Sequence, residues 1–250
     1  MTADAARLKA QMADLIARQG HEVDGNLEAH MADPALPLID VEKWAGTYAA
    51  TLEPVLQRML LAGWREGQRR LSTAQGKALI EGWDVFDPNV LTWAQNYPRE
   101  FGARVNTAFA KRITQVVATG MSEGQRLSEL RARVNEQVFS GTATKAKADT
   151  IARTEASRAS NAGIEQSWRS SGVVSAKVWR TTPTAEWPCE WCLAMEGKII
   201  ELDAPFFEQG QELETDAGKM RFDYETVGHP PLHPNCLCTE DPVLIDEEPG

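Results

Sequence analysis

The sequence predicts an α+β protein, with a mainly α-helical N-terminal part followed by a small α+β module that cysteine and histidine hold closed. Three observations lead to this fold class. Apolar residues recur at helical spacing through the first two thirds of the chain, an alternating pattern begins after residue 172, and all four cysteines lie between 189 and 238. With 250 residues, 42% of them hydrophobic, the chain can bury a core.

Apolar stripes predict the first two helices. The stripe over 8–16 has helical spacing, and Gly20 is expected to end this helix. The stretch 21–38 contains two prolines, two histidines and a glycine, which predict a loop. A second stripe covers 44–60, and Pro54 inside it is expected to kink or break the helix.

Two further helices are predicted before residue 120. The pair Asp87-Pro88 is typical of a helix start, with aspartate as the N-cap and proline at the first helical position. Pro98 is expected to interrupt this helix. A stripe over 101–117 then predicts another helix, which we expect to extend as far as Gly120.

Helices over 122–139 and 143–170 are predicted next. The sequence from Ser122 to Gln125 has the pattern of a capping box, which opens a helix. The second of these helices carries small residues on one face, and such a face lets another helix approach closely. They are Ala152, Ala156, Ala159 and Gly163.

A β-rich module is predicted over 174–238. Apolar and polar residues alternate over 174–179, which indicates a strand, and Gly197 begins a turn into a second short strand. The stretch 203–235 is rich in Pro, Gly and Asp and would be a long loop unless something pins it. The cysteines could supply that constraint.

Cysteine and histidine form the strongest chemical pattern. The motif is Cys189-x2-Cys192, then 43 residues, then Cys236-x-Cys238, with His233 three positions before Cys236. These spacings suit one tetrahedral zinc ion held by Cys189, Cys192, Cys236 and either His233 or Cys238. Two disulfides are the alternative, and free thiols are a third. Zinc, in a structural role, is the only cofactor that we expect.

Enzyme patterns are incomplete, and we expect no catalytic residues. The sequence Pro188-Cys189-x2-Cys192 matches half of a zinc deaminase signature, but no H-x-E precedes it. A zinc-containing DNA nuclease, with His229 or His233 as general base and Asn235 nearby, is the alternative from another class. It needs a further metal ligand at helix spacing, which the sequence after 238 does not supply.

Charge is unevenly distributed. The net charge of −10 argues against a coat of nucleic acid over the whole chain. Residues 176–250 contain 16 acidic and 5 basic residues, whereas residues 99–171 contain 12 basic and 7 acidic ones. No apolar run reaches the roughly 18 residues of a membrane span, and the N-terminus lacks a signal-peptide core, so we expect a soluble protein without membrane contact.

The order of motifs over 120–242 resembles the phage Mu F-like head morphogenesis family of minor head proteins. The matching pieces are Gly120-Met121-Ser122, the sequence I-A-R-T-E-A over 151–156, Asn161, Gly163, Lys177-Val178-Trp179, Cys189-x2-Cys192, Glu196-Gly197-Lys198 and the closing sequence P-L-H-P-N-C-L-C over 231–238. Two family arginines are missing, one shortly before Cys189 and one between the last two cysteines, where Leu237 stands.

The resemblance implies a domain organisation and a role. Residues 1–119 correspond to the variable helical region, 120–242 to the family domain and 243–250 to an acidic tail. Such proteins are structural components of the virion of a tailed phage, associate with the portal in the procapsid and are involved in DNA packaging or ejection. The implied partners are the portal protein and the major capsid or scaffold protein, and the implied location is the virion, with the host cytoplasm during assembly. A zinc-stapled interaction protein of another system remains a third interpretation.

Two further sets of residues follow from this comparison. The structural motif consists of Arg153, Thr154, Glu155, Asn161, Trp179, Gly197, Pro234 and Asn235, and we expect Arg153 to dock its helix onto the 176–238 module. Non-specific contact with DNA phosphates would use the basic stretch. The candidate DNA contacts are Arg104, Lys111, Arg112, Arg126, Arg131, Arg133, Lys145 and Lys147.

Overall fold

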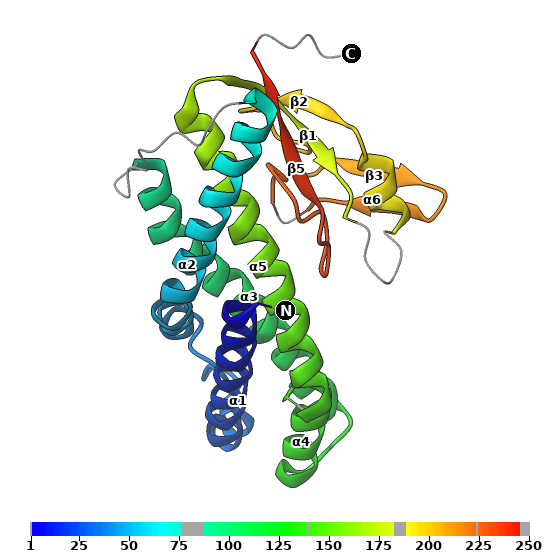
Figure 1. The fold of residues 1–250 in the computed structure, drawn as a ribbon. Helices are drawn as coiled ribbons and strands as arrows, with labels where there is room; N and C mark the ends of the chain where they lie inside the picture. Colours follow the sequence, from blue (N-terminus) through cyan, green and yellow to red (C-terminus); the bar gives the residue numbers. More distant parts are fainter. Residues whose placement is uncertain (1, 77–87, 140, 183–188, 224, 246–250) are drawn as a thin grey trace. The chain divides into compact units, whose positions relative to one another are not determined.

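The computed structural model describes residues 2–76, 88–139, 141–182, 189–223 and 225–245, without the side chains of 89 and 141–145. It is mainly helical with a small sheet, which confirms the predicted fold class. The elements in chain order are α1 (Ala3–Ala32), α2 (Val41–Gln75), α3 (Pro88–Ser122), α4 (Leu127–Val134), the π-helix η1 (Asn135–Phe139), α5 (Gly141–Ser171), β1 (Val174–Arg180), α6 (Glu190–Met195), β2 (Ile199–Glu201), β3 (Glu212–Thr215), β4 (Gly218–Arg221) and β5 (Thr239–Leu244) (Figure 1).

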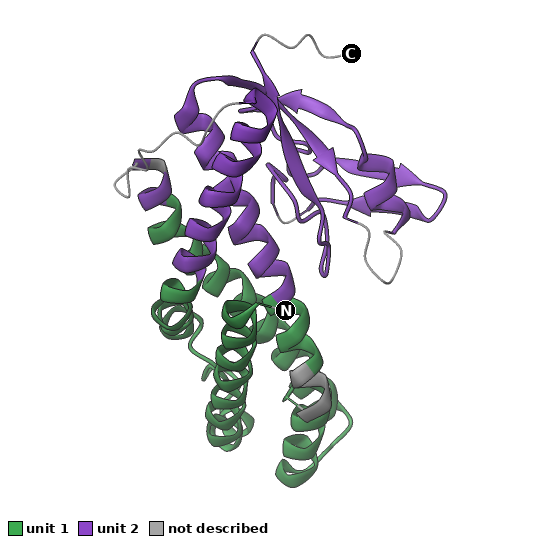
Figure 2. Cartoon of the chain, in the orientation of Figure 1, with its two compact units in different colours: residues 1–55, 93–152 green, residues 56–92, 153–250 purple. Residues whose placement is uncertain are grey.

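The chain forms two compact units. Unit 1 contains residues 1–55 and 93–152, and unit 2 contains residues 56–92 and 153–250 (Figure 2). The helices α2, α3 and α5 therefore contribute residues to both units. The predicted division at residues 119 and 120 is a division by sequence motif and stays a prediction. Among the described residues, no helix is long and apolar enough to cross a membrane.

Unit 1 has a polar group at the centre of its helical core. Gln19, Tyr48 and Asn106 come from three different helices and are fully buried. The hydroxyl of Tyr48 donates to Oε1 of Gln19 at 2.8 Å, and the amide nitrogen of Gln19 donates to Oδ1 of Asn106. Because each polar atom has a partner, this part of the core fixes how α1, α2 and α3 pack.

The first helix is longer than predicted. It continues through Gly20 to Ala32, so the prediction of a loop over 21–38 is wrong for most of its length. Val23 and Leu27 are buried and extend the apolar stripe. The glycine has a packing reason, since a Cβ at Gly20 would lie 3.1 Å from the ring of Phe139.

Neither proline breaks its helix, so the predicted interruption at Pro98 is wrong, and at Pro54 a kink is the alternative that stays a prediction. Pro54 lies inside a continuous α2 and Pro98 inside a continuous α3. Proline removes one helical hydrogen bond, but helix formation here rests on packing of the apolar stripe on both sides of it. The proposed helix start at Asp87 lies outside the described residues.

The predicted helix over 122–139 begins five residues later. Ser122 is the last residue of α3, Gly124 takes the left-handed conformation with φ of 74°, and α4 begins at Leu127. The carboxylate of Glu129 accepts from the backbone N–H of Arg126 at 2.7 Å, so the N-terminal contact lies four positions after the expected capping box. The helix then ends as η1.

Glycines let α2 and α5 approach closely in unit 2. A Cβ at Gly63 would lie 2.0 Å from the carbonyl oxygen of Ser160, and one at Gly163 would lie 2.0 Å from that of Leu60. The indole of Trp168 donates to the carbonyl of Gly67 at 3.1 Å. The small face predicted for this helix thus packs against a second small face that the sequence analysis did not identify.

The sheet of unit 2 has the order β2-β1-β5, and both pairings are antiparallel (Figure 1). The predicted first strand and the second short strand are β1 and β2. The stretch 203–235 is not one loop, because β3 and β4 form a hairpin within it. β1 is covered on both faces, since Lys177 and Trp179 are as fully buried as its apolar neighbours.

Candidate metal centre

Five side chains that could hold a metal ion converge in unit 2. Cys189 is the N-cap of α6 and Cys192 lies in its first turn, so three-residue spacing places both sulfurs on one side of the helix. His233, Cys236 and Cys238 belong to the segment before β5, where the N–H of Cys236 donates to the carbonyl of His233 in a tight turn. All five predicted ligands are therefore brought together.

The distances suit a shared ion. Nε2 of His233 lies 2.9 Å from Sγ of Cys189 and 3.2 Å from Sγ of Cys192, and the sulfurs of Cys192 and Cys236 are 3.7 Å apart. Two thiolates on one tetrahedral zinc lie about 3.8 Å apart, whereas a disulfide needs about 2.05 Å. The four cysteines are free thiols in the structure. The cluster could thus hold a metal ion.

Cys192 is the common member of two triads. Cys189, Cys192 and His233 form one triad, and Cys192, Cys236 and Cys238 form the other, with the donor atoms in each lying within 4.8 Å of one another. A tetrahedral ion takes four of these five donors. Cys192 is the residue present in both triads, so a set of four ligands that contains either complete triad contains Cys192.

His233 forms a hydrogen bond through Nδ1, which leaves Nε2 available to a metal ion. Nδ1 lies 2.8 Å from the carbonyl oxygen of Pro234, and because a carbonyl only accepts, Nδ1 carries the proton. Nε2 then has a lone pair directed at the sulfurs of Cys189 and Cys192. This orientation by a backbone carbonyl is common for metal-binding histidines.

The thiols also influence one another. The hydrogen bond between Cys192 and Cys236 holds the pKa of Cys236 well below its usual range and raises the pKa of Cys192. In the protein alone, one thiolate is thus stabilised by a neighbouring thiol. A divalent cation would favour ionisation of all of them.

A hydrophobic core holds three of the five candidate donors, whereas Cys189 and His233 are half-buried. Cys192, Cys236 and Cys238 are buried in the same apolar cluster as Trp179 and Met195. The rings of Trp179 and Phe206 pack edge to face with centroids 5.0 Å apart. A closed set of thiol and imidazole donors in an apolar core is typical of structural zinc rather than catalytic zinc.

Side chains of α5 hold the cysteine segment by its backbone. The amide of Asn161 donates to the carbonyl of Cys238 at 3.1 Å, and Oδ1 of Asn161 accepts from the hydroxyl of Thr239 at 3.0 Å. The hydroxyl oxygen of Thr154 accepts from the N–H of Asn235 at 3.0 Å. Asn235 takes the left-handed conformation with φ of 63°. These contacts give the motif residues a physical role in positioning the cluster.

The other motif residues lie nearby in unit 2. Gly197 takes φ of 74°, which favours glycine, and its N–H donates to the carbonyl of Trp179 at 3.0 Å. Glu155 is buried beside Arg158, whose guanidinium also pairs with Glu225 at 2.8 Å. The side chain of Arg153 is exposed. Its predicted docking role stays a prediction, and the α5 contacts described above come from its neighbours.

An ion cluster that the sequence analysis missed lies beneath the sheet. Nζ of Lys177 donates to Glu165 at 3.0 Å and to the carbonyl of Gly228 at 2.7 Å, and Arg169 pairs with the same glutamate. Glu240 is fully buried, and burial followed by the charge of Glu165 raises its pKa well above the usual range. The only sequence signal was a lysine within a strand of apolar residues.

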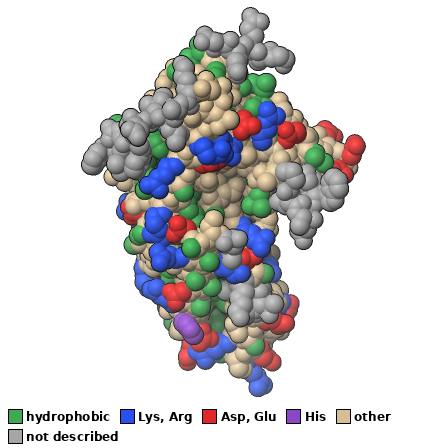
Figure 3. All heavy atoms as spheres, viewed as in Figure 1, with side chains coloured by type: hydrophobic (Ala, Val, Ile, Leu, Met, Phe, Trp, Pro, Cys, Tyr) green, Lys and Arg blue, Asp and Glu red, His purple; other side chains and the backbone are tan. Residues whose placement is uncertain are grey.

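The candidate DNA contacts belong to unit 1, and their role stays a prediction. Arg131 pairs with Asp24 at 3.1 Å and Arg133 with Glu123. Acidic and basic side chains alternate over the visible face (Figure 3). Arg104 lies over the ring of Tyr97 and Lys147 over that of Phe109, while Lys111, Arg112 and Arg126 are exposed. The side chain of Lys145 lies outside the described residues.

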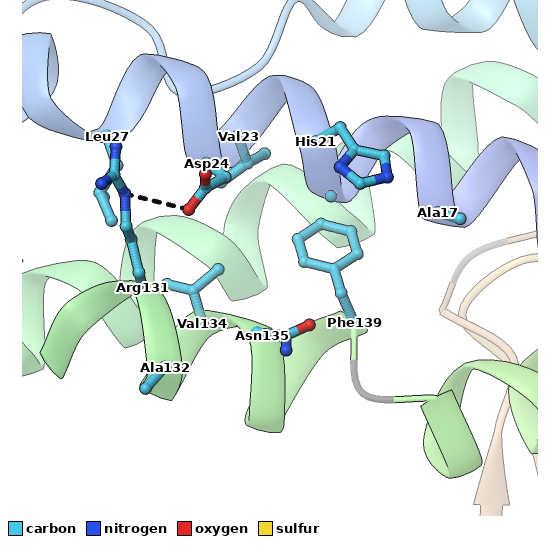
Figure 4. Close-up of a pocket in the computed structure, with 11 residues that line it drawn as sticks. Ala17, His21, Val23, Asp24, Leu27, Arg131, Ala132, Val134, Asn135 and Phe139 are labelled. Atoms are coloured by element: carbon cyan, nitrogen blue, oxygen red, sulfur yellow. Dashed lines mark ion pairs between the residues drawn. The ribbon is translucent and has the colours of Figure 1, made fainter. Parts of the chain in front are cut away.

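Unit 1 also contains a hollow of about 450 Å³ that no sequence pattern indicated. Arg131 of α4 faces Asp24 of α1 across it, and the ring of Phe139 lies below His21 (Figure 4). Its lining is mainly apolar, with Ala17, Val23, Leu27 and Val134 among the lining residues. The hollow holds none of the predicted metal-binding residues.

The geometry does not favour the nuclease alternative. His233 is surrounded by sulfur, and Nδ1 of His229 donates to the carbonyl of Pro230 at 2.7 Å, while burial lowers the pKa of His229. Within the described residues, the groups able to hold a metal consist of cysteine and histidine, without a carboxylate. Nuclease metal sites for Mg²⁺ or Mn²⁺ rely on oxygen ligands.

A comparison with protein families gives one match. The family model described as Phage Mu protein F like protein matches residues 111–240, slightly more than half of the chain. The matched region includes all five donors of the cluster and the α5 residues that hold it. No curated protein and no solved structure matches the chain.

Proposed function

Because the chain belongs to the Phage Mu protein F like family, we propose that it is a structural head-morphogenesis protein of a tailed phage. The observation that carries this proposal is the closed Cys/His cluster inside the matched region, tied to α5 by Asn161 and Thr154. Such a module supplies a rigid surface rather than a reaction site. We accordingly propose a role in assembly without catalysis.

The finer proposal concerns partners and location. In it, the protein joins the procapsid at the portal, is retained in the virion and assists DNA packaging or ejection, with assembly in the host cytoplasm. The same proposal includes contact with the major capsid or scaffold protein. It also includes non-specific contact between DNA and the exposed basic side chains of Lys111, Arg112 and Arg126. Their exposure supports the DNA contact.

Co-assembly tests this role. The chain is expressed with the portal and major capsid proteins of the same phage genome, and particles are separated by sedimentation. We expect the chain in portal-containing particles and a loss of at least about tenfold with Asn161→Ala, whose matched control is Asn135→Ala, an exposed asparagine of η1. Absence of the unmodified chain from portal-containing particles would contradict the proposal.

We also propose that the cluster binds one zinc ion through Cys189, Cys192, Cys236 and either His233 or Cys238. Bound zinc would cross-link α6 to the segment before β5. Native mass spectrometry with parallel thiol counting tests this, and one zinc with four reduced cysteines is expected. His233→Gln should weaken zinc binding if histidine is the fourth ligand, whereas the control His30→Gln in α1 should not. Two disulfides without metal would exclude the zinc site.

A further inference from the structure

A second hollow in unit 2 is lined by arginines from two separate elements. Arg69 and Arg70 belong to the last turns of α2, and Arg180 is the last residue of β1. Together with Thr239 and Asp241 they border a space of about 470 Å³. Basic and acidic side chains gather on the face of unit 2 that is in view in Figure 3. The hollow lies apart from the donors of the metal centre, none of which lines it.

One carboxylate occupies the position between two of these arginines. Oδ1 of Asp241 lies 3.3 Å from Nη1 of Arg70, and Oδ2 lies 2.9 Å from Nε of Arg180. The side chain of Asp241 is 43% exposed and that of Arg180 is 44% exposed, so solvent reaches the pair. Two guanidinium groups on one oxyanion form the arrangement with which proteins bind phosphate.

Each guanidinium has further donor capacity. Arg70 and Arg180 form their hydrogen bonds through Nε and Nη1, and Arg69 forms its hydrogen bonds through Nε and Nη2. Within the described part of the chain, each of the three arginines therefore has one terminal amino group that forms none of these hydrogen bonds. A tetrahedral oxyanion can accept from three such groups, whereas a carboxylate has only two oxygens.

The charge of the hollow differs from that of its surroundings. Its lining contains three arginines and one aspartate. Two further carboxylates flank it without lining it, since Glu66 pairs with Arg69 and Arg70, and Glu196 pairs with Arg180. The excess of guanidinium groups at the concave lining itself favours a small anion that enters the hollow. An acidic environment also discourages non-specific binding elsewhere on this part of the chain.

The hollow is built on fixed elements. Nη1 of Arg70 donates to the hydroxyl of Thr239 at 2.9 Å and to the carbonyl of Glu240. Thr239 in turn donates to Asn161, which binds the carbonyl of Cys238. Arg70 is thus held in place by β5, and only 19% of its side chain is exposed. A preorganised guanidinium loses little entropy when it binds an anion.

We propose that this hollow binds an oxyanion of the phosphate class, which displaces the carboxylate of Asp241 from between Arg70 and Arg180. The phosphate group comes either from a free phosphate or pyrophosphate or from the backbone of a nucleic acid. This inference does not depend on the proposed function in assembly.

The test uses the full chain and two kinds of probe. Pyrophosphate is titrated by calorimetry at low salt, and a fluorescent duplex oligonucleotide is titrated by anisotropy. Arg180→Gln and Arg69→Gln are expected to weaken binding about tenfold each, since each removes a charged donor. Asp241→Asn is expected to strengthen it several-fold because the competing carboxylate is lost. Binding of pyrophosphate alone identifies a free phosphate as the source, and binding of the duplex identifies the nucleic acid backbone.

Arg221→Gln is the matched control, because Arg221 lies in β4 of the same unit, is exposed and pairs with Asp223. It should leave affinity unchanged. The side chain of Arg69 is 62% exposed, so its substitution tests the site without endangering the fold. The proposal is overturned if neither probe binds, if Arg221→Gln weakens binding as much as Arg180→Gln, or if Asp241→Asn leaves affinity unchanged.

Discussion

The side-chain amide of Asn161 donates a hydrogen bond of 3.1 Å to the backbone carbonyl of Cys238, 77 positions later in the chain. This contact fixes a cysteine of the cluster by its main chain and leaves the sulfur to face the other donors. The same asparagine accepts from Thr239. α5 therefore positions the candidate metal centre without contributing a ligand to it.

Replacing Asn161 should destabilise unit 2. Asn161→Ala removes the side-chain donor to the carbonyl of Cys238 and the acceptor for the hydroxyl of Thr239, which costs about 1–3 kcal/mol. Urea unfolding followed by tryptophan fluorescence measures this, because Trp179 lies in the same core. The exposed Asn135→Ala should change stability by less than about 0.5 kcal/mol. Equal stability of both variants would show that the Asn161 contacts do not matter.

A methyl group at Gly163 should disrupt the packing of α2 against α5. The added Cβ would lie 2.0 Å from the carbonyl oxygen of Leu60, and backbone cannot move aside as a side chain can. We expect Gly163→Ala to cost about 3 kcal/mol or more. Thermal unfolding followed by circular dichroism gives the measurement.

Gly46→Ala is the control for this substitution. Gly46 lies inside α2, as Gly163 lies inside α5, but a Cβ at Gly46 meets nothing within 4 Å. Alanine has the higher helix propensity, so this variant should be unchanged or more stable by up to about 1 kcal/mol. If Gly163→Ala were as stable as Gly46→Ala, the close approach of the two helices would be refuted.

Local patterns predicted the elements better than their ends. The apolar stripes and the alternation over 174–179 are properties of neighbouring residues, and they correctly indicated helices and β1. Gly20, Pro54 and Pro98 would end helices in an isolated segment. In the protein, packing across elements outweighs that local preference, as the contact between Gly20 and Phe139 illustrates.

The sequence predicted the candidate metal-binding residues, but not the buried ion cluster or the arginine hollow in the same unit. Cysteine and histidine spacing predicted five candidate donors, since metal coordination constrains residue type and separation, and the structure brings these side chains together. Lys177, Glu165 and Glu240 come together only when α5 packs on the sheet. The arginine hollow likewise brings Arg70 of α2 beside Arg180 of β1, 110 positions later in the chain, so no local pattern could indicate it.

Removing a bound metal should loosen unit 2 selectively. A chelator, or Cys192→Ser, would leave a buried cluster of thiols without its cross-link, and Cys192 belongs to both triads. Loss of structural zinc typically unfolds small modules. We expect increased proteolysis within 189–245, whereas α1 of unit 1 should resist the protease as well as before. Cleavage that a chelator leaves unchanged in zinc-loaded protein would exclude a stabilising metal.

Glu240 should make stability fall as pH rises. Burial and the charge of Glu165 raise its pKa in the folded state above the ordinary value of an unfolded glutamate, so the folded protein retains a proton that the unfolded chain releases. Stability from this group is complete below the unfolded pKa. It decreases as pH rises toward the folded pKa, by up to about 1.4 kcal/mol per pH unit. Lys177, Arg70 and Arg169 oppose the shift but do not cancel it.

Glu240→Gln removes this titration while keeping the shape of the side chain. Urea unfolding of the full chain between pH 5 and pH 9 should show a smaller loss of stability on the alkaline side for this variant than for the unmodified protein. Glu214→Gln, at an exposed position of β3, should leave the profile unchanged. Parallel profiles for the unmodified protein and Glu240→Gln would mean that Glu240 titrates as it does in the unfolded chain, and that its carboxylate is charged inside the fold.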